Sequence, residues 1–427
     1  MSTVERVTLG HDGVESLARR LSPPPPDPAI AQRVGEILAD VRARGDDALV
    51  ESARRFDCPD FTHDLIRVPG ADLASAEAAL DPPLREALLT AVAQVRTLAD
   101  ATRPADVHAT LPFGQRITVR AIAVSSAGIY VPGGRAAYPS SLIMGAVPAQ
   151  AAGVERIAIV TPPGPDGRAA PVVLATASLL GIDEVFAVGG PAAIGALAFG
   201  TERIPPVAVI AGPGSAWVQE GKRQVFGTVG IDAVAGPSEI VIVADGAVDA
   251  EAIAADLLAQ AEHGPDSPAI LVSPDEEIIA AVGAVLDGAD IAGAVTLVRC
   301  DTLDVAMRFA EAFAPEHLEL DVTDASGLAG SVRQAGAVFT GANGGTAFGD
   351  YIAGSNHILP TGGAARFASA VGPATFMRRM SVVDLSDAAV SALTPHLARM
   401  ADAEGFPYHR RSAEVRAARI ARQGVNE

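Results

Sequence analysis

The chain has 427 residues, of which 49% are hydrophobic and 19% charged, which is typical of a globular protein with two or three domains. Its formal net charge of -19 argues against nucleic acid or an anionic membrane as a partner, because both require a basic face. Two distant cysteines, Cys58 and Cys300, exclude a disulfide framework or thiolate zinc site, and since no signal peptide or membrane span is apparent we expect a cytoplasmic protein.

The N-terminal part of the chain predicts an arm followed by a helical layer. The sequence SPPPPDP at residues 22–28 predicts a stiff extended spacer after an arm of residues 1–24. Such an arm often packs on a partner subunit. Residues 29–102 then have helical periodicity, most clearly over 34–56 and 84–102.

From Ile157 onward, short apolar runs alternate with helical segments, and this pattern occurs in two successive series. The first ends near Gly227 and the second begins at Glu239. Alternating strands and helices predict parallel sheets, so we expect an α/β protein with two Rossmann-like doubly wound domains. The expected boundaries are 1–24 for a helical arm, 25–129 plus 237–380 for one domain, 130–236 for the other, and 381–427 for a helical tail that reaches a neighbouring subunit.

Two glycine-containing turns are candidates for phosphate binding. Gly212–Trp217, GPGSAW, follows a predicted strand and opens a helix, which is where a dinucleotide pyrophosphate would meet backbone amides. The third glycine of the usual motif is missing. Val131–Ser141, VPGGRAAYPSS, contains paired glycines that permit close approach of a ligand. Either segment alone is equally compatible with a structural turn.

The segment Asp249–His263 is predicted to be a helix with a core-facing apolar stripe. Gln260 and His263 are three residues apart and lie off that stripe, and Gly264-Pro265 then ends the helix. The pair looks like half of a metal site, but for this segment alone a solvated polar face with a C-terminal histidine is the more common explanation, and glutamine is an unusual zinc ligand.

Three further histidines lie close to carboxylates and chain reversals. His317 follows Glu316, His357 comes seven residues after Asp350, and His409 comes five after Glu404. Individually, each pair is more often a surface feature than a catalytic one. If Glu316 and His317 lie on a strand, their side chains point to opposite faces, so both reach one substrate only if Pro315 bends the chain.

Several blocks between Ile129 and His409 together resemble the zinc-dependent histidinol dehydrogenases of histidine biosynthesis. They agree with that family in order and approximate spacing, which is far more specific than a single glycine motif. The blocks are GIYVPGGRAAYPSS, AFGTE, AGPSEI, LLAQAEHGPDS, APEHLEL and GDYIAGSNHILPTGGAARF.

The resemblance implies an intertwined homodimer that oxidises L-histidinol with two NAD molecules, through bound histidinal, to L-histidine. It implies Glu316 and His317 as the acid/base pair, with the zinc/substrate side in 25–129 plus 237–380 and the NAD side in 130–236. The implied zinc ligands are Gln260, His263, Asp350 and, from the other subunit, His409. These residues also contact substrate in the family, as do the matching positions Ser238, His357 and Glu404.

These residue types suit the implied chemistry. A zinc ion with one carboxylate, two imidazoles and an amide retains positive charge, so it can hold the substrate's nitrogen atoms and polarise a nearby oxygen. The ordinary pKa of histidine lies near the working pH, so His317 can take the alcohol proton as hydride leaves. Glu316 can deprotonate the water that attacks the aldehyde.

Two positions on the cofactor side depart from the family pattern. Ala192 stands where the family usually has glutamine, and Ser215 where it usually has asparagine, whereas Tyr130 is retained. Tyr130 and Ser215 therefore remain the candidate NAD contacts. The departures leave open a dehydrogenase for another polar alcohol, such as a sulfonated propanediol. A third hypothesis is a metal-binding protein without turnover, against which the intact Glu316 and His317 argue.

Overall fold

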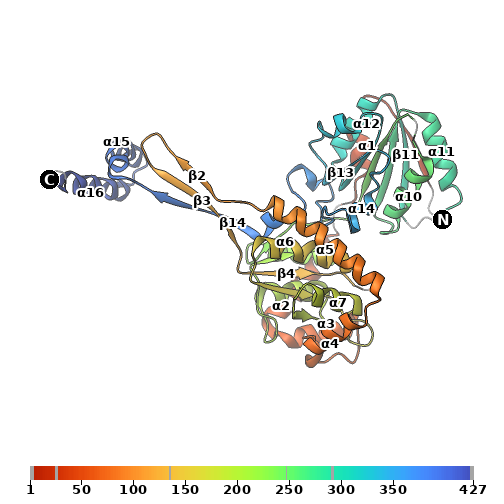
Figure 1. The fold of residues 1–427 in the computed structure, drawn as a ribbon, viewed down its shortest axis with the longest axis horizontal. Helices are drawn as coiled ribbons and strands as arrows, with labels where there is room; N and C mark the ends of the chain where they lie inside the picture. Colours follow the sequence, from red (N-terminus) through yellow and green to blue (C-terminus); the bar gives the residue numbers. More distant parts are fainter. Residues whose placement is uncertain (1–3, 25–26, 134–135, 247, 290–292, 424–427) are drawn as a thin grey trace. The chain divides into compact units, whose positions relative to one another are not determined.

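The computed structural model describes residues 4–24, 27–133, 136–246, 248–289 and 293–423, and the chain divides into two compact units (Figure 1). Unit 1 comprises Met1–Arg103 and Val124–Phe376, and unit 2 comprises Pro104–Ala123 and Met377–Glu427. Unit 1 has the expected α/β fold with parallel sheets. No helix in the described ranges is long and apolar enough to cross a membrane.

The first sheet of unit 1 has six parallel strands in the order β1-β11-β10-β9-β12-β13. Its central strands are short, fully buried apolar runs, as expected where helices cover both faces. Helices α1 and α12 cover one face, and α10 and α11 cover the other (Figure 1). The bounds are β1 (Glu5–Leu9), β9 (Ile240–Ala244), β10 (Pro268–Ser273), β11 (Ala294–Cys300), β12 (His317–Asp321), β13 (Ala337–Thr340), α1 (Val14–Leu21), α10 (Ala250–Ala261), α11 (Glu276–Leu286) and α12 (Leu303–Phe313).

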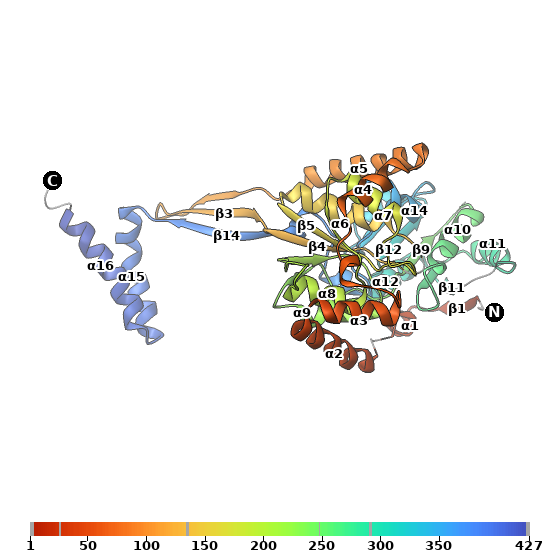
Figure 2. The same cartoon turned by 90° about the horizontal axis from the view of Figure 1, so that it is seen from below.

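The second sheet of unit 1 has five parallel strands in the order β6-β5-β4-β7-β8. Helices α6 and α7 lie on one side of it, and α8 and α9 on the other (Figure 2). The bounds are β4 (Ser126–Tyr130), β5 (Arg156–Val160), β6 (Glu184–Phe186), β7 (Val209–Ala211), β8 (Gly230–Ile231), α6 (Pro139–Ala152), α7 (Pro171–Leu179), α8 (Gly190–Phe199) and α9 (Ala216–Val225).

The helical layer between residues 28 and 102 packs on the helices of this second sheet. It consists of α2 (Pro28–Arg44), α3 (Asp46–Phe56), α4 (Gly70–Ala78) and α5 (Pro82–Thr102). Helix α2 contacts α8 and α9, α4 contacts α7, and α5 contacts α6. Residues 25–129 were predicted to belong with 237–380. The observed packing differs, because helices α6–α9 cover the apolar faces of these N-terminal helices. Gly45, with φ +54, divides the first predicted run into α2 and α3.

The N-terminal arm was predicted to be helical, but only part of it forms a helix. Residues 5–9 form strand β1, which pairs in parallel with β11 of the same chain. The sequence ERVTL contains the β-branched Val7 and Thr8, which favour a strand over a helix. Pro25 and Pro26 of the predicted spacer lie outside the described residues, and α2 begins at Pro28, the last residue of the spacer, with Asp27 as the N-cap.

Unit 2 contains a three-stranded antiparallel sheet and two helices. The strands are β2 (Val107–Thr110), β3 (Arg116–Ala123) and β14 (Met377–Asp384), in the order β14-β3-β2. The helices are α15 (Asp387–Ala403) and α16 (Pro407–Gln423). The tail was predicted to be helical from residue 381, but eight residue pairs along β3 keep the chain extended to Asp384.

The two sheets of unit 1 share a strand order. Apart from β1, each runs third, second, first, fourth, fifth in chain order, so the order reverses between β4 and β7 in one sheet and between β9 and β12 in the other. Ligands in such sheets commonly bind at this reversal, outside the carboxyl ends of the strands. Tyr130 and Ser215 lie at this reversal in the second sheet, whereas Ser238 and His317 lie at the amino ends of β9 and β12.

Candidate functional site

A buried carboxylate, Glu316, is held at the amino ends of β9 and β12. Ser238 Oγ donates a hydrogen bond to Glu316 Oε2 at 2.5 Å, and the Glu239 backbone amide donates to the same oxygen at 3.0 Å. The exposed fraction of Glu316 is only 6%. Because charge-assisted hydrogen bonds fix both the position and the direction of a carboxylate, this arrangement suits a base that must face one substrate.

His317 lies between two carboxylates. Its Nδ1 atom is 3.6 Å from Glu316 Oε2, and its Nε2 atom is 3.3 Å from Asp350 Oδ1. Asp350 lies on the short helix α14 (Thr346–Tyr351), which is oriented in turn by His357. His357 Nδ1 donates to the Asp350 carbonyl oxygen at 2.7 Å, and its Nε2 accepts from Ser141 Oγ at 3.1 Å.

The pKa values of this cluster are coupled. Burial raises the pKa of Glu316 above its ordinary value. Burial alone would lower the pKa of His317, but the charges of Glu316 and Asp350 raise it to about 9. For Asp350 the effect of burial is outweighed by the hydrogen bond and charge of His317, and its pKa is lowered. The pKa of His317 is therefore above the ordinary histidine value, near the working pH, that was expected, because the imidazole lies between two acids.

The chain turns immediately before this pair, as its geometry requires. Ala314 caps α12 with φ +54, and a bend follows at Glu316, one residue after Pro315. Ala314 is the one non-glycine residue with positive φ in the described ranges, a conformation that costs energy and often occurs at functional sites. As a result, Glu316 precedes β12 and points toward Ser238, while His317 opens the strand and faces Asp350.

Part of the predicted metal site comes together in unit 1. Gln260 lies in the last turn of α10, is 5% exposed, and has its Oε1 atom 3.4 Å from Ser238 Oγ. Its Nε2 atom has no hydrogen-bond partner among the described residues. His263 follows the helix, and its charge contributes to the lowered pKa of Asp350. In the described part of the chain, no three His, Cys, Asp or Glu side chains are placed to hold a metal.

The remaining two predicted residues of this site, Glu404 and His409, belong to unit 2. Glu404 caps the end of α15, and His409 lies in the first turn of α16 with its ring centroid 5.3 Å from that of Phe406. Both side chains are exposed in the single chain. They are accessible to a partner.

The predicted cofactor residues lie at the carboxyl ends of β4 and β7. Tyr130 ends β4 and is buried, and its hydroxyl accepts a hydrogen bond at 3.2 Å from the amide of Gly190, where α8 begins. Burial raises the Tyr130 pKa to about 12. Ser215 is the exposed N-cap residue of α9. Ala192 is 2% exposed, so its side chain faces the interior. In the other glycine turn, Gly134 and Arg135 lie outside the described residues.

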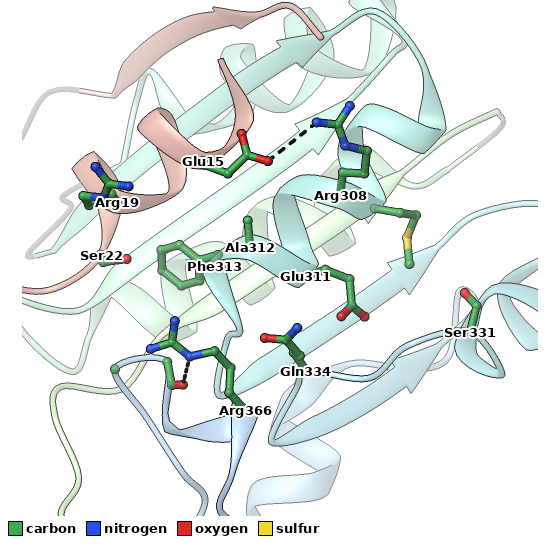
Figure 3. Close-up of a pocket in the computed structure, with 13 residues that line it drawn as sticks. Glu15, Arg19, Ser22, Arg308, Glu311, Ala312, Phe313, Ser331, Gln334 and Arg366 are labelled. Atoms are coloured by element: carbon green, nitrogen blue, oxygen red, sulfur yellow. Dashed lines mark hydrogen bonds and ion pairs between the residues drawn. The ribbon is translucent and has the colours of Figure 1, made fainter. Parts of the chain in front are cut away.

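A pocket of about 710 Å³ lies elsewhere in unit 1, between α1, α12 and the segment Gly362–Arg366 (Figure 3). Figure 3 shows Arg19 and Arg366 around Phe313 at one side of the pocket, and Glu311 and Gln334 at the other. Within the described ranges, none of the predicted catalytic, metal or cofactor residues lines this pocket. The buried titratable groups around Glu316 and His317 therefore lie at a different place in unit 1.

Sequence reasoning missed several residues that shape these sites. Glu239 is fully buried, and its Oε1 atom accepts from the Gly362 amide at 2.9 Å. Ser141 supports His357. Lys222 and Asp232 form a buried ion pair beside Gly212. The sequence does place a charged residue next to an apolar run, as in SEIVIV around Glu239, and this pattern indicates a buried charge. It does not indicate which residue pairs with that charge.

Comparison with known proteins gives a consistent result over nearly the whole chain. A family model described as histidinol dehydrogenase matches residues 26–417. The histidinol dehydrogenase of Rhodospirillum rubrum is 46% identical over 397 residues, covering 90% of this chain and 91% of the relative. That of Caulobacter vibrioides is 44% identical, with 93% and 94% covered. A crystal structure of histidinol dehydrogenase from Elizabethkingia anophelis has a TM-score of 0.91 at 29% identity, with both chains covered completely.

Proposed function

The chain belongs to the histidinol dehydrogenase family, and we propose that it oxidises L-histidinol through bound L-histidinal to L-histidine, the final step of histidine biosynthesis, with two NAD molecules. The observation that carries this proposal is the buried Glu316–His317 pair, oriented by Ser238 on one side and Asp350 on the other. The cluster contains a fixed carboxylate base and an imidazole, which are the two proton carriers that oxidation of an alcohol and a hydrated aldehyde requires.

In this proposal, Glu316 accepts a proton from the water that adds to the aldehyde, and His317 accepts the proton of the alcohol as hydride leaves. Both side chains are buried, which limits the access of bulk water to them. His317 must accept a proton, so its raised pKa has to fall when substrate is bound. Asp350 is also a proposed metal ligand, and a cation bound to it would offset the negative charge that stabilises the imidazolium.

We propose that Gln260, His263 and Asp350 of one chain hold Zn²⁺ together with His409 of the partner subunit. Zinc bound there would anchor the amine and imidazole nitrogens of the substrate. Glu404 would come from the same partner as His409, with Ser238 and His357 also in the substrate-binding set. Met400 and Tyr408 beside these residues are 65% and 86% exposed, and such apolar exposure supports a homodimer in which the C-terminal unit contacts its partner.

We assign the NAD side to residues 130–236 and the zinc/substrate side to the strands within 237–380, each as a Rossmann-like half. The strand orders support this assignment, because both match the doubly wound pattern. The pyrophosphate of NAD would lie at the start of α9, where the first backbone amides have no hydrogen-bond acceptor within the helix.

A substitution at this helix start tests the cofactor side. Ser215→Asn should tighten NAD binding roughly two- to tenfold, since one added hydrogen bond is worth about 0.5–1.5 kcal/mol. Asparagine and serine cap helices about equally well, so the melting temperature should not change. Isothermal titration with NAD measures the effect, and an unchanged Kd would remove Ser215 from the cofactor site.

The substrate assignment is tested with purified protein, Zn²⁺ and NAD. NADH formation from L-histidinol, in a ratio of two NADH per histidine produced, would support it. A panel of small polar alcohols, including a sulfonated propanediol, tests the alternative favoured by Ala192 and Ser215. Turnover of another alcohol with none of histidinol would favour that alternative, and no turnover on any alcohol would favour the non-catalytic one.

A further inference from the structure

Both backbone groups of Gly212 are held by one buried ion pair. Asp232 Oδ2 accepts a hydrogen bond from the Gly212 amide at 2.8 Å, and Lys222 Nζ donates to the Gly212 carbonyl oxygen at 3.0 Å. Lys222 Nζ also lies 2.5 Å from Asp232 Oδ1. The exposed fractions of the two side chains are 1% and 3%, so the pair is closed off from solvent.

This ion pair joins three elements around the glycine turn. Gly212 follows β7, Lys222 lies within α9, and Asp232 follows β8. The Gly212 φ angle is +133, and a Cβ atom placed on it would lie 2.2 Å from the carbonyl oxygen of Tyr130. The turn is thus pressed against the end of β4, at the reversal of strand order where ligands bind in such sheets.

Stability alone is a poor explanation for this arrangement. Desolvating two charges costs several kcal/mol, and well-packed apolar residues are often at least as stabilising as a buried ion pair. The pair does, however, supply a donor and an acceptor to a backbone position just beyond the paired residues Val209–Ala211. Fixing both backbone groups of Gly212 fixes the direction in which the chain enters α9.

We propose that Lys222 and Asp232 are positioning residues for the dinucleotide. They hold Gly212 in the conformation that points the first amides of α9 at the pyrophosphate, without touching the cofactor themselves. This inference rests on the proposed NAD-dependent function. It also explains how a turn without the third glycine of the usual motif keeps a defined shape.

The experiment compares three variants, and Trp217, the single tryptophan of the chain, reports NAD binding by its fluorescence from the first turn of α9. Lys222→Met should lower the urea midpoint and raise the Kd for NAD roughly ten- to hundredfold, the effect of losing a hydrogen bond to a charged group. Lys222→Met combined with Asp232→Asn removes both charges, so the midpoint should recover while the Kd stays high. The matched control is Arg203→Met, which breaks the ion pair of Arg203 with the buried Asp46 (2.7 Å); it should lower the midpoint and leave the Kd unchanged.

Two other results would overturn this inference. If the double variant binds NAD as tightly as the wild type, Gly212 does not need the pair. If the Kd follows the urea midpoint through all three variants, including the control, the pair acts only on stability. Failure of the wild-type protein to bind NAD would instead contradict the proposed function, so the two failures are distinguishable.

Discussion

Replacing Glu316 with glutamine should reduce kcat for NADH formation from L-histidinol by roughly 10²–10⁴-fold, the usual contribution of a positioned general base. The expected loss is chemical, because a glutamine carbonyl oxygen can still accept the hydrogen bonds from Ser238 and from the Glu239 amide. Folding and the position of the side chain should be preserved, while the capacity to accept a proton is lost.

The measurement is kcat and KM at saturating NAD, together with the melting temperature of the variant. Glu276→Gln serves as the matched control, because Glu276 is exposed in the first turn of α11, and it should leave kcat unchanged. If Glu316→Gln keeps more than about a tenth of the wild-type kcat, below the usual contribution of a general base, Glu316 is not that base.

Removal of metal should abolish activity, and added Zn²⁺ should restore it. The physical reason is that Zn²⁺ held by the proposed ligands Gln260 and Asp350 would anchor the substrate nitrogens, and that anchor is lost with the metal. Zinc bound to the folded protein at about 100 times its Kd should also add about 2.7 kcal/mol to the free energy of unfolding. Full turnover by metal-free protein would contradict the proposed site.

A variant separates metal binding from catalysis. His263→Ala should lower the zinc content well below one ion per chain, as measured by atomic emission, because it removes a strong imidazole ligand. His108→Ala is the control, since His108 lies on an exposed strand of unit 2 and is hydrogen-bonded to Thr118. Equal zinc content in the two variants would remove His263 from the ligand set.

The sequence predicted the strands and helices more accurately than it predicted which of them pack or pair with one another. Buried runs such as IVIVA and ILV identified strands of parallel sheets because helices cover both of their faces. The placement of the long N-terminal helices was wrong, since an amphipathic stripe indicates that a helix packs but does not indicate against which sheet. Strand β14 was missed because its partner β3 is about 250 residues earlier in the chain, beyond the reach of any local pattern.

In the candidate site, too, the sequence did not reveal contacts between residues that are far apart in the chain. Residue types and family blocks identified Glu316 and His317, and the need for a bend before them follows from strand geometry. The sequence did not reveal that Ala314, just before this bend, has a left-handed conformation. Nor did it reveal Glu239, or the shift in the His317 pKa, because both depend on neighbours brought together by the fold.

The antiparallel sheet of unit 2 can be completed only late in synthesis, because its strands lie far apart in the chain. Strands β2 and β3 emerge from the ribosome about 250 residues before β14, which at 5–20 residues per second is roughly 10–50 s. During that time one edge of β3 has no partner and is a potential site of aggregation. Arg116 and Arg120, exposed along β3, are the charged residues that discourage another chain from pairing there. After β14 is made, it pairs with both arginine positions, opposite Asp384 and Met380, and the nascent chain no longer offers that edge.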